Sequence, residues 1–372
     1  MLEAMKKKSK ELSAHDYYLN EALVLAKKRR GFCAPNPSVG AVIVKNRKMI
    51  GSANHWAAGY FHAERQALME IGKKAKGASL YVTLEPCCHW GKTPPCTDII
   101  IHSGIKKVFY AARDPNPIIS GKGIQILKSA GILCEQIKLP AIDLFYQSYY
   151  YWTQHHLPWV TAKLAMSLDG KIAGPQGEPV SLTGAQLNTF THQSRRESDA
   201  ILTTVNTIIH DDPQMNVRLH DEIIQKPVYV LDSQLRLPLQ AKIIKTASSL
   251  TLFHEANADA ARKQKLITEK IRCIEVIKEN NQLNLKAVFQ KIGQDGVQDV
   301  WIEGGSRIFE SLLQQKLANR ALIYVAPIVL GPQAYPAFRE GVGPLGRGEH
   351  LSWWVCGEDV VCEISNSGRL PL

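Results

Sequence analysis

Strand-like and helix-like runs alternate along the chain, and this alternation restricts its fold more than any other feature. Short apolar runs rich in β-branched residues stand between segments whose apolar residues recur at helical spacing. In the first part of the chain the pattern predicts strands at 39–45, 79–85 and 106–112 and helices at 13–30, 63–72, 96–104 and 123–131. Such alternation is typical of a layered α/β domain whose sheet is at least partly parallel.

The aromatic tract "YQSYYYWTQHHLP" (146–158) interrupts this alternation and ends before a new strand. Beyond it the pattern predicts strands at 159–167, 200–204, 227–232, 299–305 and 321–327 and helices at 184–197 and 307–315. A chain of 372 residues is long enough for two domains with separate cores. We therefore expect two α/β domains, 13–153 and 154–372, after a lysine-rich tail at 1–12.

The cellular compartment bears on how the cysteines are interpreted. No run approaches the roughly 18 apolar residues of a membrane-spanning helix, and the lysines of the N-terminus are not followed by the apolar core of a secretory signal. We therefore expect a cytoplasmic protein that acts without a membrane, in a compartment where thiols stay reduced. Its eight cysteines then indicate core residues or metal ligands more than disulfides.

The net charge of +11 comes entirely from the first part of the chain. Residues 1–156 hold 22 Lys and Arg against 11 Asp and Glu, whereas residues 157–372 hold 23 of each. A solvated basic face with a basic tail accounts for this excess. An anionic partner, either a phosphorylated small molecule or RNA, is the alternative explanation. Charge alone leaves these alternatives open.

Four residues of the first domain have the chemistry of a catalytic metal site. His62 and Glu64 open one predicted helix, while Cys87 and Cys96 stand before and at the start of the next. One imidazole and two thiolates suit zinc with an open fourth position, and zinc lowers the pKa of a bound water molecule. Glu64 can carry a proton to a leaving amine. The pattern predicts a hydrolytic deaminase that acts on an aromatic ring.

Other interpretations of the same residues remain open. A lone His-x-Glu is common, and Cys87 and Cys96 could pack in a core or form a disulfide. Cys88, beside Cys87, could compete for the metal. The joint pattern of His-Ala-Glu, a strand, Pro-Cys and a second cysteine favours zinc over each of them.

These motifs resemble the cytidine deaminase superfamily, whose signature is H-x-E followed by P-C-x-x-C. Eight residues separate Cys87 from Cys96 here, instead of two. With "NPSVGAVIV", "TLEPCCHWGKTPPC" and "DPNP", the longer loop resembles the riboflavin-biosynthesis deaminases. The resemblance implies an α/β/α domain with catalytic Glu64, zinc ligands His62, Cys87 and Cys96, and substrate contacts from Asn36 and His89. Lys92, from the same loop, is a further candidate contact for an anionic substrate.

A second set of motifs lies after residue 157. The pair Gly304–Gly305 follows a predicted strand and opens a helix, where bare amides suit a pyrophosphate. By itself such a pair is more often a tight turn. No G-x-G-x-x-G occurs in the chain, which disfavours a Rossmann domain.

"KLAMSLDGKIA" (163–173), "HDDPQMNVR" (210–218) and "WIEGGSRIF" (301–309) resemble the reductase domain of bifunctional RibD-type proteins, similar in fold to dihydrofolate reductase. The resemblance implies NADPH as cofactor. It places substrate contacts at Lys163, Asp169, Pro179, Arg195, Met215, Arg218 and Glu303. It places cofactor contacts at Ala165, Ser181, Thr207, Asp211, Ser233, Gly304, Gly305, Ser306, Arg307 and Ile308. Arginine suits bidentate contact with phosphate, although any one of these arginines alone is more often a surface residue.

The segment "GEPVSLTG" (177–184) departs from the resemblance. Pro179 stands where relatives commonly have a substrate-contacting serine, and Ser181 where they have a tryptophan near the cofactor. Because proline has no backbone N–H to donate, we expect weaker binding there or a rebuilt loop.

Together the resemblances imply a bifunctional enzyme of riboflavin synthesis. Its substrate would be a pyrimidinone that carries two amino groups and a ribosylamino 5′-phosphate. It would be deaminated with zinc and then reduced by NADPH, in a homo-oligomer, dimer or tetramer, without nucleic acid. The rivals are a nucleobase or RNA deaminase with an accessory domain and a non-catalytic zinc-binding interaction protein.

Overall fold

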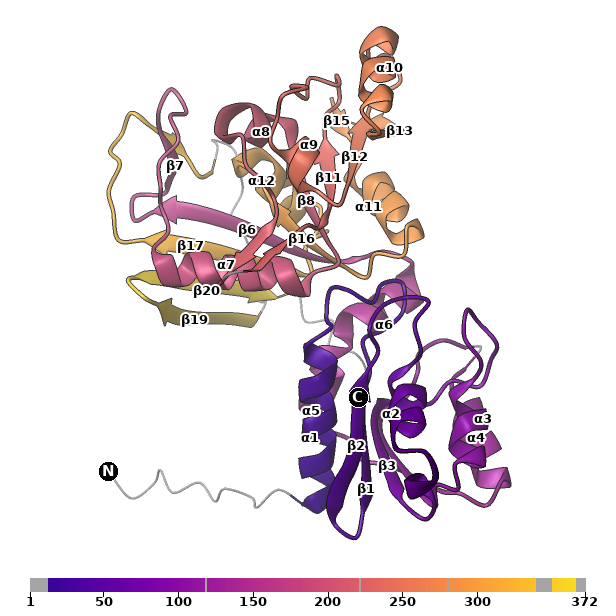
Figure 1. Ribbon diagram of the computed structural model, residues 1–372. Coiled ribbons are helices and arrows are strands. Elements are labelled where there is room, and N and C mark those ends of the chain that lie inside the picture. Colours follow the sequence, from indigo (N-terminus) through magenta and orange to yellow (C-terminus); the bar gives the residue numbers. More distant parts are fainter. Residues whose placement is uncertain (1–12, 118, 221, 280, 339–349, 366–372) are drawn as a thin grey trace, which may run out of the picture. The chain divides into compact units, whose positions relative to one another are not determined.

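The computed structural model describes residues 13–117, 119–220, 222–279, 281–338 and 350–365 (Figure 1). The chain divides into two compact units, one ending at Thr153 and the other beginning at Gln154. Each unit has its own large sheet and its own buried apolar clusters. The α/β class predicted for both halves is confirmed. The basic tail predicted at 1–12 lies outside the described residues.

The first unit is built on a five-stranded sheet in the order β2-β1-β3-β4-β5 (Figure 1). β3, β4 and β5 run parallel, whereas β1 is antiparallel to both β2 and β3. The strands are β1 (Gly40–Lys45), β2 (Lys48–Asn54), β3 (Ser79–Leu84), β4 (Lys107–Ala112) and β5 (Leu133–Gln136). The partly parallel sheet matches the prediction, but the hydrophobic pattern missed β2 and β5.

Helices cover both faces of this sheet, because its central strands are apolar on both sides. On β1, Ala41 and Ile43 face one core while Val42 and Val44 face the other. The first core is covered by α2 (Ala63–Ile71), the 3-10 helix η1 (Gly72–Ala75), α3 (Cys96–His102) and α4 (Lys122–Ser129). The second core is covered by α1 (Ala14–Lys27), α5 (Pro140–Phe145) and α6 (Gln147–His155). The unit therefore has the α/β/α layers that were expected.

Local sequence signals set the helix ends in this unit. The Ser13 hydroxyl accepts a hydrogen bond from the Asp16 N–H at 3.1 Å, and the Asp16 carboxylate accepts one from the Ser13 N–H at 3.3 Å. This reciprocal capping box starts α1. α2 stops at Gly72, whose φ of +54° glycine adopts without a steric penalty from Cβ.

The aromatic tract at 146–158 contains the division between the two units, which falls between Thr153 and Gln154, and its residues 147–155 form α6. Two of its tyrosines, Tyr146 and Tyr149, are buried, and their hydroxyls find polar partners inside the unit. Tyr146 Oη donates to Ser38 O at 2.9 Å and lies 2.6 Å from Thr83 Oγ1. Tyr149 Oη donates to Asp114 Oδ1 at 3.0 Å. Buried hydroxyls with partners carry little desolvation cost, so a tyrosine-rich helix can serve as core.

The second unit is built on a nine-stranded sheet in the order β13-β12-β11-β8-β16-β6-β17-β20-β19. The strands from β13 to β17 run parallel, and β20 and β19 extend the sheet in antiparallel fashion. The parallel strands are β6 (Trp159–Ser167), β8 (Ala200–Thr204), β11 (Pro227–Leu231), β12 (Ser249–His254), β13 (Arg272–Glu275), β16 (Asp299–Glu303) and β17 (Arg320–Ala326). The antiparallel ones are β19 (His350–Cys356) and β20 (Asp359–Ser365).

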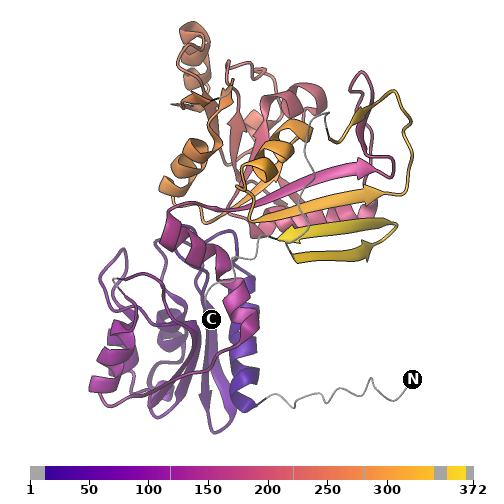
Figure 2. The same cartoon turned by 180° about the vertical axis from the view of Figure 1, so that it is seen from behind.

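Helices lie on both faces of this sheet too. One face is covered by α7 (Ala185–Glu197), α8 (Val205–Asp211), α9 (Ile243–Thr246) and α10 (Ala260–Thr268), and the other by α11 (Leu285–Gln294) and α12 (Ser306–Gln314) (Figure 2). Three strand pairs stand outside the large sheet. They are β7 (Lys171–Pro175) with β18 (Ala334–Pro336), β9 (Val217–Leu219) with β10 (Glu222–Ile224), and β14 (Lys278–Glu279) with β15 (Gln282–Leu283). Among the helices of the described ranges, none combines the length and apolar character needed to cross a membrane.

The close approach of α1 to β1 gives a test of the fold. A Cβ added at Gly40 would stand 1.9 Å from Ala22 O, so Gly40→Ala must push helix and strand apart. We expect this substitution to lower the free energy of unfolding of the first unit by about 3 kcal/mol, seen as a lower denaturant midpoint. Gly91→Ala is the control, since its Cβ would stand 3.8 Å from the nearest atom. Equal midpoints for the two variants would contradict this packing.

Candidate functional site

The first unit brings one imidazole and two thiols together. His62 stands directly before α2, Cys87 follows β3, and Cys96 begins α3. The sulfurs of Cys87 and Cys96 lie 3.3 and 3.5 Å from His62 Nδ1. The ligand atoms of all three residues lie within 4.8 Å of one another. This donor set fits a tetrahedral zinc ion that keeps one position open.

The cysteines support this donor set. All eight are free thiols, so the disulfide considered for Cys87 and Cys96 is wrong. Within the described residues, Cys88 is not part of the cluster although it adjoins Cys87. The Cys96 N–H donates to Cys87 Sγ at 3.4 Å. The side-chain hydrogen bond with Cys96 lowers the pKa of the Cys87 thiol, so that Cys87 favours the thiolate form that binds metals.

Glu64 lies in the first turn of α2, two residues after His62, and its side chain is buried. Its Oε2 atom has no hydrogen-bond partner within the described residues. Burial raises the pKa of the Glu64 carboxyl to about 7. A carboxyl with a pKa near neutrality can both accept and donate a proton at neutral pH.

His55 belongs to this site, although no local motif marked it. Its ring packs edge-on against that of His62, with 5.1 Å between the centroids. Burial lowers the pKa of His55 to about 4, so the ring is neutral at neutral pH. A neutral ring that donates from Nδ1 to Phe61 O, at 3.1 Å, can accept at Nε2 from the Asn36 amide, at 3.2 Å. His55 therefore fixes the orientation of Asn36, a predicted substrate contact.

The loop between the two cysteine ligands carries the other predicted contacts of this site. His89 is half-buried, and its Nδ1 has no hydrogen-bond partner within the described residues. Lys92 is exposed, and its Cδ lies 3.9 Å from where a Cβ on Gly59 would stand. A buried imidazole nitrogen without a protein partner is a candidate for a hydrogen bond with a ligand.

The second unit contains a pocket of about 870 Å³, in the range of small-molecule and cofactor sites. Its walls come from β6 and β7, the ends of β8, β11 and β16, and the start of α12. The predicted contacts that line it are Lys163, Ala165, Pro179, Ser181, Arg195, Thr207, Asp211, Met215, Ser233, Glu303, Gly304, Gly305, Ser306, Arg307 and Ile308. The structure therefore gathers all but two of the residues predicted for the second domain.

The glycine pair fits a ligand that comes close to the backbone. Gly304 directly follows β16, and a Cβ there would stand 2.6 Å from Ile308 Cγ2. At Gly305, which caps α12, the nearest atom to an added Cβ is Ile172 Cδ1 at 4.0 Å. A side chain at Gly304 would displace Ile308, whereas one at Gly305 would make ordinary contact with Ile172. A nicotinamide cofactor's phosphates suit the start of such a helix.

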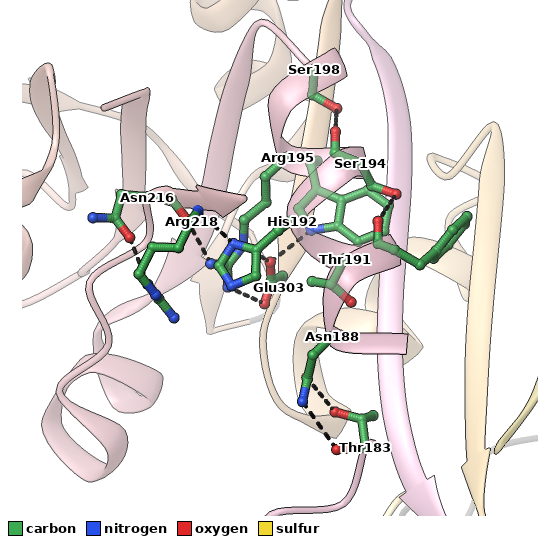
Figure 3. Close-up of polar contacts among 12 residues, drawn as sticks. Thr183, Asn188, Thr191, His192, Ser194, Arg195, Ser198, Asn216, Arg218 and Glu303 are labelled. Carbon is green, nitrogen blue, oxygen red and sulfur yellow. Dashed lines mark hydrogen bonds and ion pairs between the residues drawn. The ribbon is translucent and has the colours of Figure 1, made fainter. Parts of the chain in front are cut away.

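Arg195 is held by a buried carboxylate (Figure 3). Its Nε and Nη2 donate to Glu303 Oε1 and Oε2 at 2.5 and 2.9 Å, and its Nη1 donates to Asn216 O at 2.9 Å. Trp301 Nε1 donates to Glu303 Oε1 at 2.7 Å. Burial alone would raise the pKa of Glu303, but the charge and hydrogen bonds of Arg195 outweigh it and lower that pKa to about 2. The pair fixes one wall of the pocket.

Two predicted contacts do not line the pocket. The Asp169 carboxylate accepts hydrogen bonds from Ser167 Oγ at 2.6 Å and from the N–H groups of Leu330 and Gly331 at 3.1 and 2.8 Å. It therefore holds a turn. Arg218 is exposed and donates to Asn216 Oδ1 at 2.6 Å (Figure 3). Both residues were expected to contact the substrate because of their motifs, which do not specify where the side chains point.

Several pocket residues had no sequence signal. Arg236 and Tyr335 line the wall, as do Gln282 and Leu283 of β15. They come from segments that meet the pocket only through the tertiary fold. Hydrophobic periodicity predicts strands and helices, but it does not indicate which residues of such segments reach the pocket.

Comparison with known protein families gives one match in each of the two units. Residues 12–112 match the cytidine and deoxycytidylate deaminase zinc-binding region, and residues 158–362 match the RibD C-terminal domain. Riboflavin biosynthesis protein RibD of Aquifex aeolicus is 41% identical over 319 residues, which cover 84% of this chain and 87% of that protein. The chain belongs to the RibD family.

RibD proteins are similar to this chain over nearly its full length. RibD of Actinobacillus pleuropneumoniae is 35% identical over 354 residues, 93% of this chain and 94% of that protein. The structure of Acinetobacter baumannii RibD has a TM-score of 0.85 and 34% identity, covering 95% of this chain and 99% of that one. A deaminase/reductase from Thermotoga maritima has a TM-score of 0.81 and 28% identity, covering 95% and 98%.

Membership of the RibD family makes the chain a bifunctional enzyme of riboflavin biosynthesis, with a zinc-dependent deaminase domain and an NADPH-dependent reductase domain. The second unit matches a RibD domain, so the alternative of an RNA deaminase with an accessory domain is not supported.

The contact between His55 and Asn36 predicts a positioning effect in the RibD deaminase site. We expect His55→Ala to lower kcat/KM for ammonia release about a hundredfold, because Asn36 loses the group that aims it. His55→Gln, which restores an acceptor oxygen, should recover part of the rate. Zinc content, measured by metal analysis, should stay at the wild-type level in both variants. Loss of zinc from His55→Ala would show that His55 acts on the metal ligands instead.

The Arg195–Glu303 pair predicts a pH-dependent stability of the RibD reductase unit. The folded-state pKa of Glu303 lies below its ordinary value of 4.5, so its stabilising contribution is complete above that pH and is lost as the pH falls toward 2. We expect Arg195→Met to lower the free energy of unfolding at pH 7 by about 3–5 kcal/mol, because it leaves a buried carboxylate unpaired.

The stability of Arg195→Met should also depend on pH differently from that of wild type. Without Arg195, burial still raises the pKa of Glu303 and only Lys163 and Trp301 lower it, so that pKa should be higher than in wild type and less stability should be lost between pH 4.5 and 2. The double variant Arg195→Met/Glu303→Gln should regain part of the lost stability at pH 7. Denaturant titrations at several pH values measure both effects. A single variant as stable as wild type at pH 7 would contradict the role assigned to the pair.

Proposed function

We propose that the first unit removes an amino group from a phosphoribosylaminopyrimidine and that the second unit reduces the sugar of the deaminated product. The observation that carries the proposal is the cluster of His62, Cys87 and Cys96 with the buried Glu64 beside it. The similar Thermotoga maritima protein is named a diaminohydroxyphosphoribosylaminopyrimidine deaminase and 5-amino-6-(5-phosphoribosylamino)uracil reductase. The same pair of reactions suits the two sites of this chain.

In the deaminase site, we assign His62, Cys87 and Cys96 as the residues that hold zinc and Glu64 as the catalytic residue. Bound zinc lowers the pKa of a water molecule at its open position. Glu64 Oε2, which has no protein partner within the described residues, is placed to accept a proton and to deliver it to the departing amino group. Asn36, held by His55, orients the pyrimidine ring, and His89 offers a polar contact from the loop.

In the reductase pocket, the protein's contribution is binding and orientation. NADPH supplies the hydride that reduces the first carbon of the sugar. Gly304 and Gly305 allow the cofactor's phosphates to approach the start of α12, and Arg307 adds a positive charge there. Lys163 and Glu303 line the wall where the sugar would lie. Burial lowers the pKa of Lys163, which lies 5.2 Å from the centre of the Tyr324 ring.

The domain boundaries and the assembly form part of the proposal. We assign the deaminase to residues 13–153 and the reductase to 154–372, and we place the protein in the cytoplasm, which suits eight free cysteines. We further propose a homo-oligomer built through the second unit. β19 ends the large sheet, and its alternating residues Leu351, Trp353 and Val355 are 52%, 63% and 73% exposed. An apolar edge strand of this kind favours contact with another protein surface.

Glu64→Gln tests the deaminase assignment. We expect ammonia release from the diaminopyrimidine phosphate to fall about 10²–10⁴-fold, because glutamine cannot carry a proton. Zinc content should stay unchanged, since Glu64 is not among the ligands. The matched control is NADPH oxidation with 5-amino-6-(5-phosphoribosylamino)uracil, which should proceed at the wild-type rate. Ammonia release that survives the substitution would overturn the proposed role, and a zinc-binding interaction protein would show no activity in either assay.

A further inference from the structure

The reductase pocket has one aromatic wall residue that the proposed reaction does not use. Within the described residues, Tyr335 is the only Phe, Tyr or Trp that lines this pocket. Its side chain is 47% exposed, so it is not needed to fill a core. An exposed aromatic ring on the wall of a ligand pocket offers a flat apolar surface to whatever enters.

The backbone that carries Tyr335 is firmly held. Tyr335 lies on β18, where it pairs with Ala173 of β7. On either side of it, Ala334 and Ala337 are buried. The Ala334 N–H donates to Gly331 O at 3.2 Å, and the Ala337 N–H donates to Gly170 O at 2.8 Å. An anchored strand with an exposed ring loses little conformational freedom when a ligand binds, which favours a binding role.

Strand order places Tyr335 at a defined end of the pocket. β7 follows β6 and β18 follows β17, and β6 and β17 are neighbours in the large sheet. Ser233 and Arg236 follow β11, which β8 and β16 separate from β6. Adjacent strands lie about 4.8 Å apart, so the β11 end is some 15 Å from β6. Tyr335 therefore belongs to the end that also holds Lys163 of β6.

The neighbours of Tyr335 on β7 are apolar residues of the pocket wall. Ala173, its cross-strand partner, also lines the pocket. Ile172 Cδ1 is the nearest atom to a Cβ placed on Gly305, at 4.0 Å, so β7 passes close to the start of α12. Tyr335 therefore lies on the part of the wall that β7 shares with the start of α12, near where the nicotinamide would meet the sugar of the substrate.

We propose that Tyr335 is a specificity-determining residue that stacks on one of the two planar heteroaromatic rings of the reaction, the nicotinamide of the cofactor or the pyrimidine of the substrate. The inference rests on the proposed reductase function. Both rings are flat and polarisable, and stacking on tyrosine suits either one. Tyr335 would recognise a flat heteroaromatic ring in both cases, and binding measurements show whether the cofactor or the substrate carries that ring.

Tyr335→Ala, with Tyr335→Phe as the matched control, tests the inference on the full chain. Dissociation constants are measured by calorimetry for NADP⁺, for adenosine 2′,5′-bisphosphate, which lacks nicotinamide, and for 5-amino-6-(5-phosphoribosylamino)uracil. Stacking on nicotinamide should weaken NADP⁺ binding to Tyr335→Ala about tenfold and leave the bisphosphate unchanged. Stacking on the pyrimidine should weaken only the uracil compound by that factor. Tyr335→Phe keeps the ring and should stay within about twofold of wild type.

Three results would overturn the inference. They are unchanged affinities for all three ligands, an equal loss for NADP⁺ and the bisphosphate, and a Tyr335→Phe variant as weak as Tyr335→Ala. Failure of the proposed reductase function would appear in the wild-type protein and not only in the Tyr335 variants. A wild type that binds neither NADP⁺ nor the uracil compound has no reductase pocket. Ammonia release by the first unit and the thermal midpoint of the second report whether Tyr335→Ala is folded.

Discussion

Both sites depend on the way parallel strands end. The carboxyl ends of parallel strands meet at one edge of a sheet, and the helices that follow begin there with unpaired N–H groups. In the first unit Cys87 follows β3, and Cys96 starts the next helix. In the second unit Thr207, Ser233 and Gly304 lie just beyond the ends of three parallel strands. Polar side chains far apart in sequence therefore converge without any interruption of the apolar cores beneath them.

The parts of the two sites that sequence could predict are those in which residue type and spacing carry the chemistry. His62, Glu64, Cys87 and Cys96 combine rare residue types with an alternation of strand and helix, and the structure brings the three ligands together. Gly304 and Gly305 mark a strand-to-helix turn in the same way. The α/β class was equally accessible, because the central strands are continuous apolar runs. In each of these cases the information lies within about 35 residues of chain.

What could not be predicted depends on contacts between distant segments. His55 matters because Asn36, on another segment, donates to it, and nothing near His55 records that contact. The burial of Tyr146 and Tyr149 depends on partners from distant segments, Ser38 O and Asp114 Oδ1. Asp169 was expected at the substrate, but backbone N–H groups of residues 330 and 331 draw its carboxylate into a turn. The order of nine strands is likewise set by packing, which no local pattern records.

Arg195 shows how such a long-range contact changes the meaning of a motif residue. Three of its five N–H groups are already used, two on Glu303 and one on Asn216 O. A phosphate that took those groups would leave Glu303 as an unpaired buried charge, which costs several kcal/mol. Arg195 therefore serves best by keeping Glu303 ionised and in place against the pocket. The exposed Arg307 at the start of α12 is not held in such a pair within the described residues, which fits the phosphate contact proposed for it.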